Sequence, residues 1–335
     1  MGEESKLFAG EQRKPYLIGV DLGGTKLLTV VSTREGKILI RKKEETRAGE
    51  GPEAVINQIS ENVAEVISLQ GIKKEQVLAA GVCSAGFYNH KKEVIVESPN
   101  LKKWSQVPLG PLLKEKVGLP LLVENDANAA AYGEYRRGAG QGRSHLIYIT
   151  VSTGIGGGVI AEGKIFRGSR GYAGEIGHTT MDIDGPRCTC GNRGCLEALA
   201  SGTAIARKAS EVLGSGRSTR IMEVAAREGR EEVTAHHVFT AAQMGDEAAA
   251  EIIERSLEYL GAGLASMANL FNPEVFVIGG GVSMSGDSFF KPLKKVFYRR
   301  AAGPVSQNVE ILPAALGEEA GIMGALLLAG EAFSP

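Results

Sequence analysis

The fold is decided by residues 16–31, YLIGVDLGGTKLLTVV, and by residues 145–161, HLIYITVSTGIGGGVIA, which share one design. In the first stretch an apolar run ends at Asp21, the chain turns at Gly23 and Gly24, and a second apolar run follows. The second stretch repeats this order of strand, glycine turn and strand. The repetition predicts a structural duplication, in which each half of the chain opens with a β-meander.

Hydrophobic periodicity predicts alternating helices and strands along the rest of the chain. Helices are expected near 52–69, 126–137, 246–270, 288–300 and 318–332. Short apolar runs predict strands at 78–82, 120–123, 275–278 and 309–312. The pattern indicates a mixed α/β architecture. Because 335 residues exceed one usual core, we expect two domains with a cleft between them.

The composition argues against several classes of function. The formal net charge is −1 and no basic patch is interleaved with aromatic residues, so nucleic acid is not expected as a partner. No apolar run approaches the ~20 residues of a membrane span. Residues 1–15 form a polar extension without the apolar core of a signal peptide. We therefore expect a cytoplasmic protein.

Residues 174–197, GEIGHTTMDIDGPRCTCGNRGCLE, contain one histidine and three cysteines at the spacing H-x9-C-x-C-x4-C. Thiolate and imidazole ligands in a tetrahedral set suit Zn²⁺, and a site that uses all four positions is structural rather than catalytic. The predicted ligands are His178, Cys188, Cys190 and Cys195. The metal is expected to hold a loop, with Glu175 and Glu197 at its two ends.

A disulfide is the alternative for these cysteines. Cys188 and Cys190 are too close in sequence for easy pairing, and three of the four cysteines lie in this one stretch. The fourth, Cys83, follows an apolar run, so we expect a buried thiol that acts as a small hydrophobic side chain. Reduced thiols fit a cytosolic compartment.

Three glycine clusters offer backbone or side-chain groups that suit a nucleotide. In DLGGTK, residues 21–26, backbone N–H groups can bind phosphate and Asp21 can hold Mg²⁺ through water. In STGIGGG, residues 152–158, Thr153 can donate to a phosphate oxygen, so two turns can bind one polyphosphate. The third cluster, GGG at 279–281, offers a flat backbone surface for a base. An ordinary hairpin at the first and a simple strand-to-helix connection at the last remain alternatives.

A buried strand delivers Glu124, Asn125 and Asp126 to the start of an alanine-rich helix. A carboxylate at such a junction is well placed for chemistry. Asp126 is expected to stay ionised, because the helix dipole favours an anion there. The alternative for Asp126 is a plain N-cap, a role that aspartate often fills.

Four motifs give the chain a resemblance to a known family: DLGGTK, ENDANAAAYGE from Glu124, STGIGGG, and GEIGH followed by C-x-C-G-N-x-G-C-L-E. Over 16–329 the chain resembles the ROK family of sugar kinases and repressors. The resemblance implies an actin-like ATPase (ribonuclease H-like) fold with two duplicated α/β domains and the active site between them. The smaller domain is expected at 16–123 plus 315–335. The larger is expected at 124–314, with the zinc-binding segment at 178–195.

The resemblance also implies a role for each matching position. Asp126 corresponds to the general base that takes the proton from the attacking sugar hydroxyl. The positions that match sugar contacts are Gly86, Asn100, Asn125, Asp126, Glu175, His178 and Glu197. Those that match the ATP and Mg²⁺ site are Asp21, Gly23, Gly24, Thr25, Lys26, Thr153, Gly154, Gly280 and Gly281. For Glu175 and Glu197, solvated surface residues or partners of the zinc ligands are the alternatives.

The implied activity is ATP-dependent phosphorylation of the 6-hydroxyl of glucose, in a homodimer or homotetramer. The sequence CSAGFYNH from Cys83 is similar to the Ala-Gly-Phe form in glucokinases of the family, whereas many members have a Pro-Gly pair followed by Val-Asp. This difference favours glucose. N-acetylmannosamine, N-acetylglucosamine, mannose and fructose stay open as alternative substrates.

Two other classes of protein are alternatives to a sugar kinase. A sugar-responsive repressor needs a DNA-binding module of some tens of residues, and only about 15 residues precede the first strand. The glycine turns alone would also permit an actin-like filament or chaperone ATPase. Zinc ligands beside two glutamates favour a small polar substrate instead.

Overall fold

The structure is a computed structural model that describes residues 14–98, 101 and 103–334. These residues pack into two compact units. Unit 1 contains the described residues up to Gly133, together with 168–172 and those from Glu319 onward. Unit 2 contains 134–167 and 173–318.

Unit 1 is built on a five-stranded sheet with the strand order β3-β2-β1-β4-β8. Its strands are β1 (Tyr16–Leu22), β2 (Lys26–Thr33), β3 (Ile38–Glu45), β4 (Val77–Ser84) and β8 (Leu121–Asn125). The β1–β2 and β2–β3 pairs are antiparallel, whereas β4 runs parallel to both β1 and β8. A smaller sheet, which the sequence did not predict, contains β5 (Phe87–Asn89), β6 (Val94–Glu97) and β7 (Ser105–Val107).

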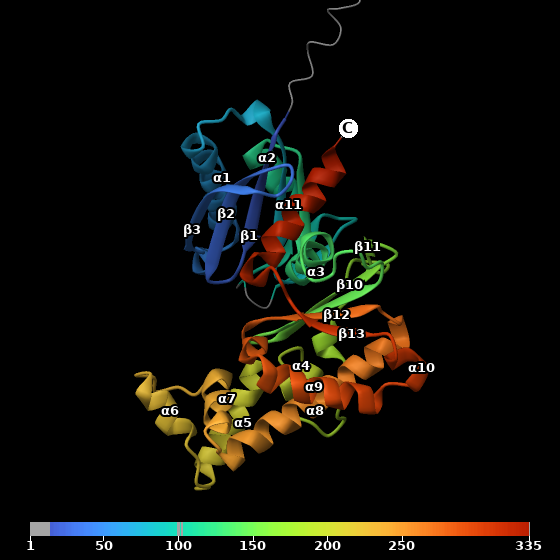
Figure 1. The fold of residues 1–335 in the computed structure, drawn as a ribbon. Helices are drawn as coiled ribbons and strands as arrows, with labels where there is room; N and C mark the ends of the chain where they lie inside the picture. Colours follow the sequence, from blue (N-terminus) through green and yellow to red (C-terminus); the bar gives the residue numbers. More distant parts are fainter. Residues whose placement is uncertain (1–13, 99–100, 102, 335) are drawn as a thin grey trace, which may run out of the picture. The chain divides into compact units, whose positions relative to one another are not determined.

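Alternate side chains of β1 face two different helical layers of unit 1. Its helices are α1 (Pro52–Leu69), α2 (Leu109–Val117), α3 (Asp126–Arg137, which continues into unit 2) and α11 (Ala320–Phe333). Ile18 joins the core beneath α1 and α2, while its neighbour Leu17 packs with Ile322 and Leu326 of α11. This two-residue period places helices on both faces of the sheet (Figure 1).

Unit 2 repeats the sheet of unit 1, with the strand order β11-β10-β9-β12-β13. Its strands are β9 (Leu146–Val151), β10 (Ile155–Ala161), β11 (Lys164–Ile165), β12 (Val275–Gly279) and β13 (Glu310–Pro313). The first three strands form an antiparallel meander, and β12 is parallel to β9 and β13. The predicted duplication is therefore confirmed, because the two sheets share the same strand order and the same strand directions.

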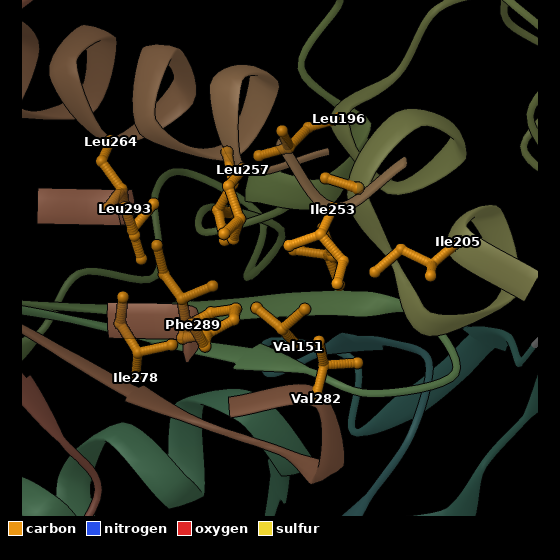
Figure 2. Close-up of a cluster of buried hydrophobic side chains, with 14 of the residues drawn as sticks. Val151, Leu196, Ile205, Ile253, Leu257, Leu264, Ile278, Val282, Phe289 and Leu293 are labelled. Atoms are coloured by element: carbon orange, nitrogen blue, oxygen red, sulfur yellow. The ribbon is translucent and has the colours of Figure 1, made fainter. Parts of the chain in front are cut away.

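The helices of unit 2 gather on its sheet as one block (Figure 1). They are α4 (Leu196–Ala200), α5 (Gly202–Gly214), α6 (Ile221–Arg227), α7 (Ala235–Gln243), α8 (Glu247–Phe271), α9 (Asp287–Arg300) and α10 (Gly303–Ser306). Figure 2 shows the core between sheet and helices, where Leu257 and Leu264 of α8 lie with Phe289 of α9 and Ile278 of β12. The α8 helix begins as predicted, because the Asp246 side chain accepts the N–H of Ala249 at 2.8 Å.

Short 3-10 helices complete the two units: η2 (Ala48–Glu50), η3 (Lys74–Gln76), η4 (Ile176–His178), η5 (Gly281–Ser285) and η6 (Gly317–Glu319). None of the helices in the described part of the chain is long and apolar enough to cross a bilayer.

The small residues of α11 let its backbone approach α3 within unit 1. A Cβ atom on Gly324 would lie 1.7 Å from the carbonyl oxygen of Ala129, which a substituted residue cannot tolerate without moving a backbone. A Cβ on Gly330, in the same helix, would meet only the Leu17 side chain, at 3.1 Å.

We predict that Gly324→Ala destabilises unit 1 by about 1–3 kcal/mol, the usual cost of overpacking. Trp104 is the only tryptophan and is buried in unit 1, so its fluorescence during urea unfolding reports this unit. Gly330→Ala is the matched control and should leave the midpoint nearly unchanged. Equal midpoints for both variants would contradict the close approach of α11 and α3.

Candidate functional site

The carboxyl ends of three neighbouring parallel strands bring two aspartates together in unit 1. Asp21 on β1 pairs in register with Cys83 on β4, and Cys83 pairs with Glu124 on β8, two residues before Asp126. The Cys83 thiol is fully buried, as predicted, and lies 3.5 Å from Asp21 Oδ1. Burial and the charges of Asp21 and Asp126 raise the pKa of this thiol well above its usual range. Both carboxylates therefore face the same small region at the edge of the sheet.

The start of α3 is capped by Asn125 and not by Asp126. The Asn125 side-chain oxygen accepts the N–H of Asn128 at 3.0 Å, which is the usual N-cap geometry. Asp126 Oδ1 accepts the N–H of its neighbour Ala127 at 2.8 Å. The N-cap alternative for Asp126 is therefore wrong, because another side chain performs that role.

Burial sets the direction of the Asp126 pKa, which lies above its ordinary value. Hydrogen bonds from the Ala127 N–H and the Asn125 side chain oppose this rise, but desolvation is the larger effect. The sequence-based expectation counted only the helix dipole and so missed the direction of the shift. A raised pKa makes the carboxylate a stronger base, closer to the working pH of most enzymes.

A buried glutamate supports this helix start. The Glu124 side chain is fully buried, and its Oε1 accepts the Asn125 N–H at 3.0 Å and the Asn128 side-chain amide at 3.2 Å. The same oxygen lies 3.1 Å from His90 Nε2. Sequence reasoning did not assign Glu124 or His90 a role, because the contact joins positions far apart in the chain.

Two of the predicted sugar contacts meet in unit 1. The Asn125 side-chain amide donates to the carbonyl oxygen of Gly86 at 3.2 Å, so the loop after β4 is tied to the start of α3. Another predicted sugar contact, Asn100, lies outside the described residues.

The first glycine turn is a tight hairpin between β1 and β2. The N–H of Gly23 donates to the carbonyl of Lys26 at 3.0 Å, and the Thr46 hydroxyl donates to the carbonyl of Gly23 at 2.8 Å. Gly24 lies in the turn, and the side chains of Thr25 and Lys26 are exposed. The backbone of this turn is thus an ordinary hairpin with an exposed hydroxyl and ammonium group, and phosphate binding by it stays a prediction.

Four ligand atoms from one segment converge in unit 2. The side chains of His178, Cys188, Cys190 and Cys195 place one ligand atom each within 4.8 Å of the others. The Cys190 and Cys195 sulfurs are 3.7 Å apart, as are the Cys188 sulfur and His178 Nδ1. A tetrahedron with Zn–S bonds of ~2.3 Å has edges of about 3.8 Å, so the four groups fit Zn²⁺.

The chemistry of these cysteines also fits a metal better than a disulfide. All four cysteines of the chain are free thiols. Burial and the neighbouring thiols raise the pKa of Cys195 to about 12, and a zinc ion bound here would hold this group as a thiolate. Since Nδ1 of His178 faces the cysteines, its Nε2 lies on the opposite edge of the ring.

The segment that ends at Glu197 also contacts the second glycine turn of unit 2. Glu197 Oε2 accepts the N–H of Ile155 at 3.0 Å, so this side chain is not a solvated surface group. Glu175 precedes the short helix η4 that carries His178. Gly154 lies directly beside Ile155, while Gly280 and Gly281 lie where β12 passes into η5.

A cavity of about 890 Å³ in unit 2 is lined by Thr153 and Gly281, two of the residues predicted to bind ATP. The other polar or flexible side chains around it come mainly from α5, α7, the loop before α7, and η5: Thr203, Glu232, His236, Thr240, Gln243, Met284 and Ser285. Sequence reasoning missed these residues because no motif marks them. The only signal was the GGG run before η5.

The duplicated sheets and the paired carboxylates define an ATPase-like α/β protein, and its Cys3His cluster fits a metal ion. The chain belongs to the ROK family, whose family model matches residues 17–332. It is 38% identical to a glucokinase from Thermotoga maritima over 93% of this chain and 96% of the relative. Its structural neighbours in the family have the actin-like ATPase fold.

One solved neighbour carries both ligands of a kinase. A ROK family glucokinase from Streptomyces griseus in complex with glucose and AMPPNP is 38% identical, with a TM-score of 0.80. The similarity covers 94% of this chain and 99% of that one. A putative xylose repressor from Caldicellulosiruptor is 31% identical over 93% of this chain and 77% of its own length.

We predict that the purified protein contains about one zinc ion per chain and that Cys190→Ser lowers this to near zero, since structural zinc sites need all four ligands. Plasma emission spectrometry measures the content directly. Thr189→Ala, between two ligands, is the matched control and should keep its zinc. Native protein that contains no zinc, when prepared without chelators, would contradict the metal site.

Proposed function

We propose that the protein is an ATP-dependent kinase that phosphorylates the 6-hydroxyl of glucose. The observation that carries this proposal is the position of Asp126, a carboxylate of raised pKa at the same sheet edge as Asp21. Relatives named glucokinase, and a neighbour solved with glucose and AMPPNP, support glucose and ATP as the substrates.

Asp126 is proposed as the general base. It takes the proton of the glucose 6-hydroxyl as O6 forms a bond to the γ-phosphorus of ATP and the bond to the leaving ADP oxygen breaks. Glu124 and Asn125 hold the helix start that carries this carboxylate. Phosphoryl transfer depends mainly on positioning and charge neutralisation, so a rigid base at a helix start suits the reaction.

The residues proposed to bind the donor are Asp21, Gly23, Gly24, Thr25, Lys26, Thr153, Gly154, Gly280 and Gly281. The cavity beside Thr153 and Gly281 is large enough for a nucleoside. Asp21 would hold Mg²⁺ through water, because carboxylate oxygens suit this ion, and Mg²⁺ would neutralise part of the phosphate charge.

The residues proposed to contact the sugar are Gly86, Asn100, Asn125, Asp126, Glu175, His178 and Glu197. A carboxylate can accept hydrogen bonds from two vicinal hydroxyls. With Nδ1 facing the metal cluster, His178 has Nε2 available for a sugar hydroxyl. The zinc ion then supports the sugar pocket without taking part in the chemistry.

We predict that Asp126→Asn lowers kcat by about 10²–10⁴-fold, the usual contribution of a general base. Glucose and AMPPNP should still bind, as measured by calorimetry. A variant with near-normal turnover in a coupled assay would reject Asp126 as the base.

Stability supplies the control for this variant. The folded-state pKa of Asp126 is raised, so ionising this group costs stability as pH rises through that pKa. Asparagine removes the charge and with it this cost. At neutral pH the variant should therefore unfold at the same urea concentration as the native protein or a higher one, which separates lost chemistry from lost folding.

A panel of sugars tests the substrate. We predict that kcat/KM with ATP is highest for glucose, and lower for mannose, fructose, N-acetylmannosamine and N-acetylglucosamine. The Ala85-Gly86-Phe87 segment supports glucose, because it is similar to the form in glucokinases of the family. Activity confined to an N-acetyl sugar would overturn the glucose assignment while keeping the kinase. A cytoplasmic location and a homo-oligomeric state belong to the same proposal.

A further inference from the structure

Glu197 connects the metal cluster to the turn at 152–155 within unit 2. Its Oε2 accepts the N–H of Ile155 at 3.0 Å, and its Oε1 lies 3.8 Å from the sulfur of Cys188 and 3.5 Å from the Thr189 hydroxyl. One carboxylate therefore lies beside the Cys188 thiol with one oxygen and accepts from the backbone of the glycine turn with the other. Zinc would take the place of the thiol proton, so metal occupancy changes the group that Oε1 faces.

The same turn is closely packed by both ends of the metal-binding segment. A Cβ on Gly154 would lie 2.4 Å from Glu197 Oε2. At the other end, a Cβ on Gly177, next to His178, would lie 2.0 Å from the carbonyl oxygen of Ile155. At Gly177, where a Cβ would meet backbone, the turn and the segment thus fit together only because the glycine lacks a side chain, whereas at Gly154 a Cβ would displace the Glu197 carboxylate.

The end of β9, the start of α4 and the helix η5 are all anchored in the hydrophobic core of unit 2. Val151 precedes the turn, Leu196 precedes Glu197, and Val282 follows Gly281, and all three belong to one buried cluster. Figure 2 shows these side chains reaching the same core from different elements. Protein interiors are close-packed and compress little, so a shift of the metal-binding segment also displaces the turn.

From these contacts we propose that Glu197 is a positioning residue for the phosphoryl donor. It holds the 152–155 turn in the conformation that binds ATP, and its own position depends on zinc in the Cys3His cluster. Zinc occupancy therefore changes ATP affinity as well as the sugar pocket. The inference rests on the proposed kinase function, which places Thr153 and Gly154 against the donor.

The test measures AMPPNP affinity by calorimetry in the absence of glucose, with zinc-loaded and zinc-stripped protein. Glu197→Ala should weaken AMPPNP binding about tenfold, or about 1.4 kcal/mol, because a charged acceptor of the Ile155 N–H is lost. Glu197→Gln keeps an acceptor and should weaken binding only about two- to threefold. Stripping zinc from the native protein should also cost about tenfold.

Removing zinc from the Glu197→Ala variant distinguishes loss of the positioning contact from general destabilisation. Zinc removal should have little further effect on Glu197→Ala, because both changes act through one contact and are not additive. Asp184→Asn is the matched control, since it removes an exposed carboxylate from the same segment and should leave AMPPNP affinity unchanged.

Equal AMPPNP affinity in the zinc-loaded and zinc-stripped native protein would overturn the inference and leave the kinase assignment intact. A full additional loss on stripping Glu197→Ala would also overturn it. If Glu197→Ala fails to fold, the native comparison and Glu197→Gln still decide the question. No AMPPNP binding by the native, zinc-loaded protein would overturn the donor assignment, and the inference with it.

Discussion

The loop between residues 178 and 195 of unit 2 depends on the convergence of one histidine and three cysteines, whose ligand atoms lie within 4.8 Å of one another. This segment has almost no hydrophobic means of folding by itself. Between 182 and 194 its one large aliphatic side chain is Ile183, which is 81% exposed. Burial of large side chains therefore contributes little to holding this loop, and zinc bound by the Cys3His cluster would supply folding free energy there. Glu197 lies at the end of the segment and accepts the Ile155 N–H, so the proposed coupling to the 152–155 turn runs through this side chain.

The duplicated sheet explains why polar groups gather where they do. In both units the first two strands form a hairpin, and a parallel strand follows in the sheet beside the first. In unit 1 this topology brings the ends of β1, β4 and β8 together, and with them Asp21 and Asp126. In unit 2 it places the 152–155 turn beside the start of η5. Similar backbone geometry places Asp126, the proposed base, in unit 1 and the cavity beside Thr153, proposed for the nucleotide, in unit 2.

Much of this was predictable from sequence, because the signals were local. Hydrophobic periodicity predicted the ends of α1 and α8 to within one residue. Ligand spacing predicted the four residues of the Cys3His cluster. What could not be predicted depended on packing between distant positions. The His90–Glu124 contact, the cavity wall from α5 and α7, and the small sheet β5–β7 have no local motif. The direction of the Asp126 pKa was missed for the same reason, since desolvation is a property of the folded chain.

Hydrogen–deuterium exchange with and without zinc follows the 152–155 turn itself and needs no substrate. If Glu197 transmits metal occupancy to the turn, the Ile155 amide should exchange at least about tenfold faster once a chelator removes zinc. The hairpin at 23–26 in unit 1, which the cluster does not hold, should exchange at an unchanged rate. Unchanged exchange across 152–158 in protein shown to have lost its zinc would contradict the account.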